Sequence, residues 1–312
     1  MSILVSKIST KDLLITDREN IRKKWGKTKA DVDGDIKIIR DWLTTQPHLP
    51  EIPSDNMIEF FLTNCKYSIE KTKQNLDMYY TIRDMLPYIY RGKNPNSASD
   101  MDVVYNTGDI IYLPKLTPEL YRICLATFND TDFENIDSRR LFIHLLANTY
   151  EVRIHEDLAM GDIYIIDFTN LKFRAVTTTT PMLLKHYVYI LEKVMSNRMK
   201  QLHFLKPPSF ISNLLAIVKN FLSAKLRERV ITHKSVESIL KYVPLELLPT
   251  DYGGEEKSIK ELAELWKEKM VEYKDRFEFL DTMKVNEDLR PEKLKNDELL
   301  GYHGNFKKLD VD

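Results

Sequence analysis

The side chains between Arg198 and Lys234 have the types and spacing that point most directly to chemistry. This segment has a formal charge of +7, whereas the whole chain has a net charge of −1. Arginine grips a phosphate with paired donors and lysine adds a mobile point charge, so the mixture matches a phosphorylated head group. Near an anionic bilayer each cation contributes about 1 kcal/mol of binding free energy. The basic residues are Arg198, Lys200, Lys206, Lys219, Lys225, Arg227, Arg229 and Lys234, and the one acid is Glu228.

An apolar run inside the same segment, Pro207 to Val218, predicts a helix over residues 209–223. Its apolar sector is broad, and cations flank it at both ends. An ordinary core helix is one interpretation, but the width and the flanking charge favour a helix that covers a cavity and also touches a membrane. One row of the sector holds Phe210, Leu214, Ile217 and Phe221, and the adjoining rows hold Ile211, Leu215, Val218 and Leu222.

The cations have two other interpretations. A charge run often forms a solvated face, and Arg227-Glu228-Arg229 is also typical of a helix end stabilised by its dipole. Nucleic-acid binding is disfavoured, because the rest of the chain is slightly acidic and lacks a basic motif interleaved with aromatic residues.

Catalytic signatures are missing from the sequence. It contains no GxGxxG, no P-loop and no GxSxG nucleophile elbow. His155-Glu156 is followed by Asp157-Leu158, which does not complete HExxH, and no Cys/His cluster has metal-ligand spacing. Asp167 at a strand end is interpreted as a satisfied hydrogen-bonding residue. We therefore expect no enzyme activity, catalytic residue, metal or cofactor.

Composition predicts an ordinary globular protein. The 312 residues, 43% hydrophobic and 30% charged, suit one large domain with a smaller partner. Cys65 and Cys124 are far apart, which favours a reducing compartment. The N-terminus lacks a signal-peptide pattern, and no uncharged stretch approaches the roughly 18 residues that span a bilayer. We expect a cytoplasmic protein, monomeric, with reversible association to endosomal or plasma membranes.

The elements that must position these residues fall into two groups. The first ninety or so residues read as helix, with apolar periodicity over residues 31–43, a short helix capped by Ser54 and a longer one starting at Ser68. Arg91 to Ser99 reads as a linker. Strands then alternate with helices, which predicts an α/β fold with a mainly parallel sheet. The strands are Tyr121–Phe128, Asp162–Phe168 and Met199–Leu205; the helices are Ile136–His155, Pro181–Asn197 and one after Glu255; a loosely held end starts at about Asn286.

The stretch Leu248-Pro249-Thr250-Asp251-Tyr252-Gly253-Gly254-Glu255, preceded by Lys225-Leu226-Arg227-Glu228-Arg229-Val230 and His233, resembles the CRAL-TRIO family. The resemblance covers roughly residues 15 to 275. It implies an N-terminal helical subdomain (1–92), a CRAL-TRIO α/β lipid-binding domain (93–256) with a mobile gate helix over a lipid cavity, and a C-terminal helix with a charged tail (257–312).

The function that the resemblance implies is a carrier. One hydrophobic ligand, a retinoid, tocopherol or similar isoprenoid lipid, would lie in an enclosed pocket and exchange at phosphoinositide-containing membranes. The gate would be about Pro208 to Leu222, with Phe210, Leu214 and Ile217 facing the ligand and Phe221 on the same row. The strands and the helix after Pro181 would supply the walls, although core packing is the stronger interpretation for any single residue. The candidates are Tyr164, Ile166, Phe168, Met182, Leu183 and Tyr187.

The same resemblance implies a site for the head group of phosphatidylinositol bisphosphate beside the gate. It maps onto Arg198, Lys200, Lys225 and Arg229, and the charged segment adds Lys219 and Arg227 as candidates. One family contact is absent: the helix that reads FLRxR or FLRGCK in the family reads Phe61-Leu62-Thr63-Asn64-Cys65-Lys66 here, so threonine replaces arginine. Lys66 is a candidate replacement.

A second hypothesis is a phosphoinositide-binding adaptor in membrane trafficking that carries no cargo. In that case the charged tail from Asn286 to Asp312 would dock a partner protein. The sequence leaves open the identity of the lipid, the phosphoinositide and the role of the tail.

Overall fold

A five-stranded sheet organises the fold of the computed structural model, which describes residues 10–92, 94–96, 105–129, 139, 142–177, 179–195 and 197–292. The strands lie side by side in chain order. The first pair is antiparallel and the other three are parallel, which confirms the predicted mainly parallel α/β sheet. The strands are β1 (Gly108–Leu116), β2 (Tyr121–Phe128), β3 (Gly161–Asp167), β4 (Met199–Leu205) and β5 (Val230–His233).

The two edge strands were not predicted from the sequence, whereas the three central strands were. β1 contains Pro114 and changes register between Tyr112 and Leu116. Proline is tolerated at a sheet edge because its missing N–H faces away from the ladder. β5 is only four residues long, too short for a period-two pattern to be recognised.

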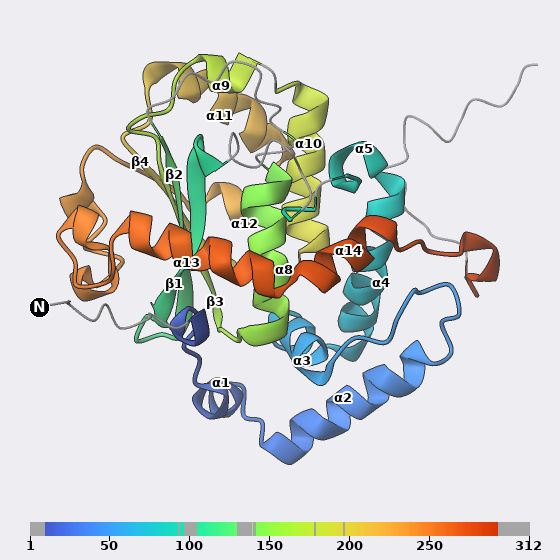
Figure 1. The fold of residues 1–312 in the computed structure, drawn as a ribbon. Helices are drawn as coiled ribbons and strands as arrows, with labels where there is room; N and C mark the ends of the chain where they lie inside the picture. The colour runs from blue at the N-terminus through green and yellow to red at the C-terminus, as the bar shows by residue number, and fades with distance from the viewer. Residues whose placement is uncertain are drawn as a thin grey trace, which may run out of the picture.

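Helices form the crossovers between the parallel strands (Figure 1). Two of these crossovers contain π-helical segments, η2 and η3. The predicted helix at Ile136–His155 corresponds to η2 and α8 from residue 142 onward; residues 130–138, 140 and 141 lie outside the described part. The bounds are η2 (Phe142–Ala147) and α8 (Asn148–Glu156) before β3; α9 (Arg174–Thr177), α10 (Pro181–Tyr189) and η3 (Ile190–Val194) before β4; and α11 (Ser209–Phe221) and α12 (Ala224–Arg227) before β5.

The N-terminal region is helical, as predicted. Ser54 Oγ accepts a hydrogen bond from the Met57 N–H, and Ser68 caps the fourth helix in the same way through Lys71 N–H. The second helix starts two residues earlier than the apolar pattern indicated, because Thr28 forms a capping box with Asp31. The elements are η1 (Thr10–Asp12), α1 (Arg18–Lys24), α2 (Lys29–Leu43), α3 (Asp55–Asn64), α4 (Ile69–Met85) and α5 (Pro87–Tyr90).

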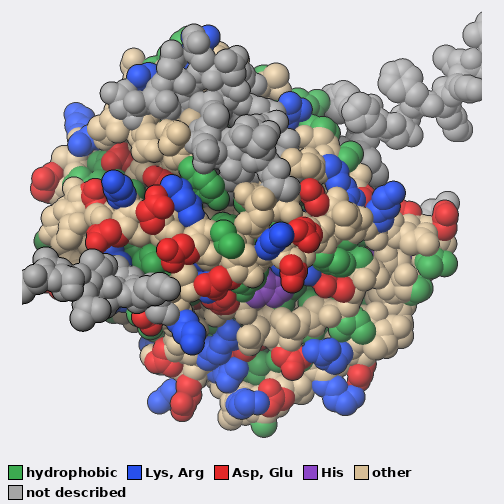
Figure 2. Space-filling view, viewed as in Figure 1, with side chains coloured by type: hydrophobic (Ala, Val, Ile, Leu, Met, Phe, Trp, Pro, Cys, Tyr) green, Lys and Arg blue, Asp and Glu red, His purple; other side chains and the backbone are tan. Residues whose placement is uncertain are grey.

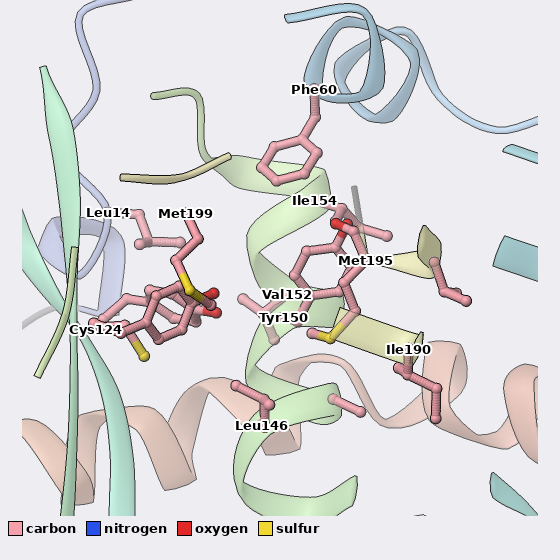
Figure 3. Close-up of a cluster of buried hydrophobic side chains, with 14 of the residues drawn as sticks. Leu14, Phe60, Cys124, Leu146, Tyr150, Val152, Ile154, Ile190, Met195 and Met199 are labelled. Atoms are coloured by element: carbon pink, nitrogen blue, oxygen red, sulfur yellow. The ribbon is translucent and has the colours of Figure 1, made fainter. Parts of the chain in front are cut away.

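These helices share one apolar core with the α/β part. The Phe60 ring on α3 lies 5.8 Å from the Tyr150 ring on α8, edge to face. In Figure 3, Phe60 points from α3 toward Ile154 and Tyr150 of α8. The Tyr79 hydroxyl on α4 donates to the buried Glu151 carboxylate on α8. The domain boundaries at residues 92 and 256 stay predictions.

Two C-terminal helices, α13 (Ile259–Glu272) and α14 (Lys274–Thr282), complete the described fold. Figure 1 shows α13 crossing in front of β1, and the Trp266 indole N–H donates to the Tyr112 carbonyl at 3.3 Å. The helix therefore covers an open sheet edge. Within the described residues, no helix combines the length and apolarity that crossing a bilayer requires.

The prediction that the chain is loosely held from Asn286 onward is wrong for residues 286–290. The Asn286 N–H donates to the His48 carbonyl at 3.0 Å, and Arg290 Nη1 lies 2.7 Å from Asp77 Oδ2. Between them is the short helix η7 (Glu287–Leu289). The charged sequence predicted a solvated end, but Arg290 has its partners, Asp77 and Thr81, on α4. Residues 293–312 lie outside the described part.

Candidate functional site: an apolar cavity beside a cation cluster

An apolar cavity of about 260 Å³ lies between one face of the sheet and the helices that follow β2, β3 and β4. Among its lining residues, Glu192 and Lys219 are the charged ones. The sheet supplies Ile110, Cys124, Ala126, Tyr164, Ile166, Met199, Leu202, Phe204 and Val230; Phe168 follows β3; and the helical side supplies Leu146, Val188, Leu191, Glu192, Leu215, Val218, Lys219, Leu222 and Leu226.

Strand register explains why these sheet residues converge. Side chains at paired positions on neighbouring strands point to the same face, so pairs form rows across the sheet. One row is Tyr112, Cys124, Tyr164, Leu202 and Val230. A second row, two residues closer to the carboxyl ends of the parallel strands, is Ile110, Ala126, Ile166 and Phe204. The predicted lining residues Tyr164 and Ile166 belong to these rows. Phe168 lies beyond them, and the centre of its ring is 5.4 Å from the centre of the Phe204 ring.

Helix α11 covers the cavity with a different row from the one that the family resemblance implied. Leu215, Val218, Lys219 and Leu222 line the cavity, whereas Phe210, Leu214, Ile217 and Phe221 do not. Ile211 is 1% exposed and fixes the rotation of the helix on the sheet. Ile217 is 37% exposed, and the Phe210 ring packs edge to face on Phe173 at 5.4 Å. Because the apolar sector is broad, its spacing alone left the rotation undetermined.

Helix α10 supplies the wall through Val188 rather than through the candidates named from sequence. Met182 is 50% exposed at the start of the helix. Leu183 and Tyr187 are buried in the main core and do not line the cavity. The Tyr187 ring stacks on Phe142 with centroids 4.2 Å apart. The apolar residues of this nine-residue helix point in several directions, so the sequence alone does not show which of them face the cavity.

Both π-helical segments contribute wall residues that sequence reasoning missed. Leu146 comes from η2, and Leu191 and Glu192 come from η3. Figure 3 shows Leu146 projecting from the helical side, with Cys124 and Met199 grouped on the sheet side. A π-helical turn inserts an extra residue and changes the facing of later side chains, and it occurs often at functional sites. No simple sequence signal marks these turns.

A cluster of cations lies at the amino ends of the parallel strands, near where α11 ends. It consists of Lys66, Arg198, Lys200, Lys225 and Arg229. Burial and the charges of Arg198, Arg229, Lys225 and Lys66 lower the pKa of Lys200. The charge of Arg229, then burial, then Lys66, Arg198 and Lys71 lower the pKa of Lys225. The charged forms of Lys200 and Lys225 are thus destabilised by their neighbours, and an anion placed among the cations would relieve the repulsion.

Aromatic rings and the backbone hold the cluster in place. The Arg198 guanidinium lies 4.6 Å from the centre of the Trp25 ring, and Lys200 Nζ lies 5.0 Å from the centre of the Tyr121 ring. Arg229 Nη1 donates to the Met199 carbonyl. None of these partners neutralises a charge. On the face shown in Figure 2, by contrast, acidic and basic side chains are intermixed.

The position of the absent family arginine is closed to ligands. Thr63 is fully buried, and its hydroxyl donates to the Tyr67 hydroxyl at 3.3 Å. Lys66 is exposed just after α3, with a backbone φ of 57°, and its charge acts on both Lys200 and Lys225. The helical region therefore contributes a cation to the cluster from another position. Arg227 is exposed on α12, and Lys219 is exposed at the cavity wall.

The signature at residues 248–255 proves to be structural. The Tyr252 hydroxyl donates to Asp167 Oδ2 at 2.8 Å, and so ties the motif to the end of β3. Gly253 has a φ of 79°, a left-handed conformation that favours glycine. A Cβ on Gly254 would lie 1.9 Å from the Leu248 carbonyl oxygen, so a larger residue has no room. The expectation that Asp167 is a satisfied hydrogen-bonding residue agrees with these contacts.

Comparison with known proteins shows which protein families this chain resembles. Residues 28–99 match the model of a Pinta-like UBA domain, and residues 106–254 match the model of the CRAL/TRIO domain. "Alpha-tocopherol transfer protein-like" of Mus musculus is 25% identical over 255 residues, which cover 78% of this chain and 70% of that protein. "Clavesin-2" of Homo sapiens is 24% identical over 233 residues, covering 70% and 68%.

Among solved structures, the chain is similar to one titled "Crystal structure of Sfh5", with a TM-score of 0.49, 12% identity, and coverage of 83% of this chain and 100% of that one. The motif, the mainly parallel sheet and the domain match agree. The chain therefore contains a CRAL/TRIO domain at residues 106–254, the domain of a family of lipid-binding and lipid-transfer proteins.

Proposed function

We propose that this protein carries one hydrophobic ligand, a retinoid, tocopherol or similar isoprenoid lipid, and exchanges it at phosphoinositide-containing membranes. The observation that supports this most is the apolar cavity under α11, next to a cation cluster that has no acidic partner among the contacts described above. An apolar ligand gains about 25 cal/mol for each Å² that it removes from water.

The size of the cavity favours a compact ligand. Its volume of about 260 Å³ is just under the range of roughly 300–1,000 Å³ that is typical of small-molecule pockets. A two-chain phospholipid would need a much larger space. A ligand of the size of a retinoid or tocopherol would require α11 to move outward, which fits its proposed role as a gate.

The ends of α11 suit such a movement. Lys206 has a φ of 48° and is followed by Pro207 and Pro208, so the chain turns sharply before the helix. After the helix, Leu222 returns to extended geometry with ψ of 141°. Hinges are short segments at the ends of elements that absorb changes in φ and ψ. The helix between them can then move as one body.

Membrane contact would involve both ends of α11. Lys225 and Arg229 follow the helix and would bind the head group of phosphatidylinositol bisphosphate with Arg198, Lys200 and Lys66. Near the other end, the Phe173 side chain is 62% exposed and packs on Phe210. Figure 1 shows α9, α10 and α11 together at one end of the molecule. Exposed apolar side chains there would enter the bilayer interface.

A transfer assay tests the proposal. Delipidated protein is titrated with retinol and with α-tocopherol, and transfer of the bound lipid is followed to vesicles with or without phosphatidylinositol bisphosphate. We expect saturable one-to-one binding and transfer at least several-fold faster to the phosphoinositide vesicles. Absence of saturable binding to both lipids would refute the carrier, and equal rates to the two vesicle types would refute phosphoinositide-dependent exchange.

The adaptor hypothesis gains no specific support. Its docking segment was placed at Asn286–Asp312, but residues 286–290 pack on the N-terminal helices, and 293–312 lie outside the described part.

A further inference from the structure

A second cavity, of about 620 Å³, lies at the carboxyl ends of the parallel strands. Three of its lining residues, Asp109, Thr127 and Asp167, are paired across β1, β2 and β3, and we call them the polar row. Each of the three is next in sequence to a residue that lines the apolar cavity, and successive side chains of a strand point to opposite faces. The polar row therefore points to the face of the sheet that the apolar cavity does not use.

Helix α13 and the signature motif form the other walls of the second cavity. Ile259 and Ala263 line it from α13, and Asp251 and Tyr252 line it from the motif. Its volume is within the range of roughly 300–1,000 Å³ that is typical of small-molecule pockets. Open α/β sheets commonly bind ligands in the crevice outside the carboxyl ends of their strands. The size and the place of this cavity therefore suit a small ligand.

The polar row carries negative charge that has no counter-ion in the described part of the chain. Asp109 is half-buried and forms no hydrogen bond or ion pair with a described residue. Burial raises its pKa to about 6, so the carboxyl group is mostly ionised at neutral pH. Asp167 accepts hydrogen bonds from the Tyr252 hydroxyl and from the N–H and hydroxyl of Thr169. These donors are uncharged, so they do not neutralise the carboxylate.

Thr127 stands between the two carboxylates with an unused hydroxyl. Its Oγ1 is buried and has no hydrogen-bond partner among the described residues. A change of rotamer would turn this hydroxyl toward the cavity that the residue lines. Directly opposed residues on antiparallel strands have Cβ atoms about 5 Å apart, so Thr127 and Asp109 can contact one ligand group together. Buried polar atoms are normally paired, so the unpaired hydroxyl indicates a group that a ligand completes.

Three lysines also line the cavity, but among the described contacts none forms an ion pair with the polar row. Lys267 Nζ lies 2.8 Å from Glu264 Oε1, so its charge is already paired. Lys206 and Lys260 are exposed, where water and salt screen their charges. The sheet side of the cavity is therefore its acidic side.

We propose that this cavity binds a small primary amine whose protonated nitrogen is held by the polar row. An ammonium group has three N–H donors, and Asp109, Thr127 and Asp167 offer three acceptors. The apolar body of the amine would lie against Ile259 and Ala263 on α13. A metal ion fits less well, because the described residues contain no group of three His, Cys, Asp or Glu side chains that could hold one. The site uses the other face of the sheet, so it does not depend on the carrier function.

Three probes that share one body test this with the full chain: 2-phenylethylamine, 2-phenylethanol and phenylacetate. In calorimetric titrations near neutral pH, we expect saturable binding of the amine, about 10-fold or more tighter than binding of the other two probes. Asp109→Asn keeps the shape and removes the charge, so it should weaken amine binding about 10-fold or more. Thr127→Val removes only the hydroxyl and should weaken amine binding about 3- to 10-fold. Asp33→Asn is the matched control, because Asp33 is an exposed carboxylate on α2.

The outcomes are distinct from those of the carrier assay, and unfolding measured in parallel shows that each variant folds. Absence of saturable amine binding, or equal binding of the amine and the alcohol, would refute the amine site. Equal amine binding by Asp109→Asn and Asp33→Asn would refute it as well. Phenylacetate binding most tightly, with the preference lost when Lys206→Met and Lys260→Met are combined, would overturn the proposal and assign an anion to the lysines. Amine binding in a protein that does not bind retinol or α-tocopherol would refute the carrier and leave this site standing.

Discussion

Glu192 Oε1 accepts a hydrogen bond at 3.0 Å from the backbone N–H of Ser223, and so joins the π-helical segment η3 to the end of α11. Glu192 also lines the cavity. One carboxylate therefore contacts both the wall of the cavity and the hinge of the helix that covers it. A hydrogen bond to a charged group contributes about 1.5–3 kcal/mol, enough to influence how often the end of the helix opens.

Removing this contact should loosen α11. In Glu192→Ala the Ser223 N–H loses its acceptor, so we expect amide hydrogen exchange near residues 219–223 to rise about 10-fold and ligand release to accelerate. Hydrogen exchange followed by mass spectrometry measures this. Glu192→Gln keeps an acceptor oxygen and should behave much more like the unmodified protein. Exchange that is unchanged in the alanine variant would show that the bond does not restrain the helix.

Charge reversal in the cation cluster should abolish phosphoinositide binding. Lys225→Glu combined with Arg229→Glu places acids beside Arg198 and Lys200, which would then form ion pairs within the protein instead of binding a phosphate. We expect loss of sedimentation with vesicles that contain phosphatidylinositol bisphosphate, and unchanged ligand uptake. The matched control is Lys241→Glu with Lys260→Glu, an equal charge change at two exposed lysines outside the cluster. Equal binding by both double variants would mean that the head-group site lies elsewhere.

Lys66 should contribute to the same binding. Lys66→Ala should weaken vesicle binding several-fold and make it less salt-dependent, because one cation near an anionic surface contributes about 1 kcal/mol. Thr63→Arg should not strengthen it. Thr63 is fully buried, so an arginine there would be an unpaired buried charge and should lower the free energy of unfolding by about 3 kcal/mol or more. Urea denaturation measures that cost, and a stable Thr63→Arg variant that binds more tightly would contradict it.

The rotation of α11 can be tested with two neighbouring leucines. Leu215 lines the cavity and Leu214 does not. Leu215→Trp should fill part of the 260 Å³ and reduce ligand capacity by more than half, while Leu214→Trp should have a smaller effect. Saturation binding with retinol measures the capacity, and unfolding measured in parallel distinguishes a loss of cavity volume from a loss of protein stability. The reverse order would place the Leu214 row toward the ligand, as the family resemblance implied.

Acid should destabilise the pairing of β4 and β5, the two strands that the α11 crossover joins. His203 on β4 and His233 on β5 lie 2.8 Å apart, Nδ1 to Nε2, near the carboxyl ends of the two strands. Burial and then the charge of His233 lower the pKa of His203 from 6.5 to about 4. The unfolded chain therefore binds the proton more tightly. The stability from the neutral imidazole is complete above about pH 6.5 and is lost as the pH falls toward 4, on the order of 2–3 kcal/mol. Urea denaturation at several pH values gives the free energy of unfolding as a function of pH. This free energy should fall less steeply with decreasing pH in His203→Gln than in the unmodified protein, and an equally steep fall would contradict the assignment.

Much of the fold could be predicted because strong local patterns coincide with family motifs. β2 matches its expected bounds because its mostly apolar run is typical of a buried strand, and β4 also matches its expected bounds. Ser54 and Ser68 mark helix starts because a side-chain oxygen satisfies an orphan N–H within three residues. These effects act over short distances, so the sequence carries them directly. The edge strand β1 was missed because its pairing partner, not its own pattern, makes it a strand.

By itself, the sequence determined the presence of an apolar helix between clustered cations, the strands around it and the signature Tyr252-Gly253-Gly254, because composition and short spacings define these features. Only the tertiary structure decided which row of α11 meets the sheet, that Lys66 lies close enough to act on Lys200 and Lys225, and that Tyr164 and Cys124 line the cavity from neighbouring strands. The reason is physical. Helix rotation, strand register and the approach of Lys66 to Lys200 all depend on packing between segments that are distant in sequence. A broad apolar sector or an isolated lysine in the sequence does not specify that packing.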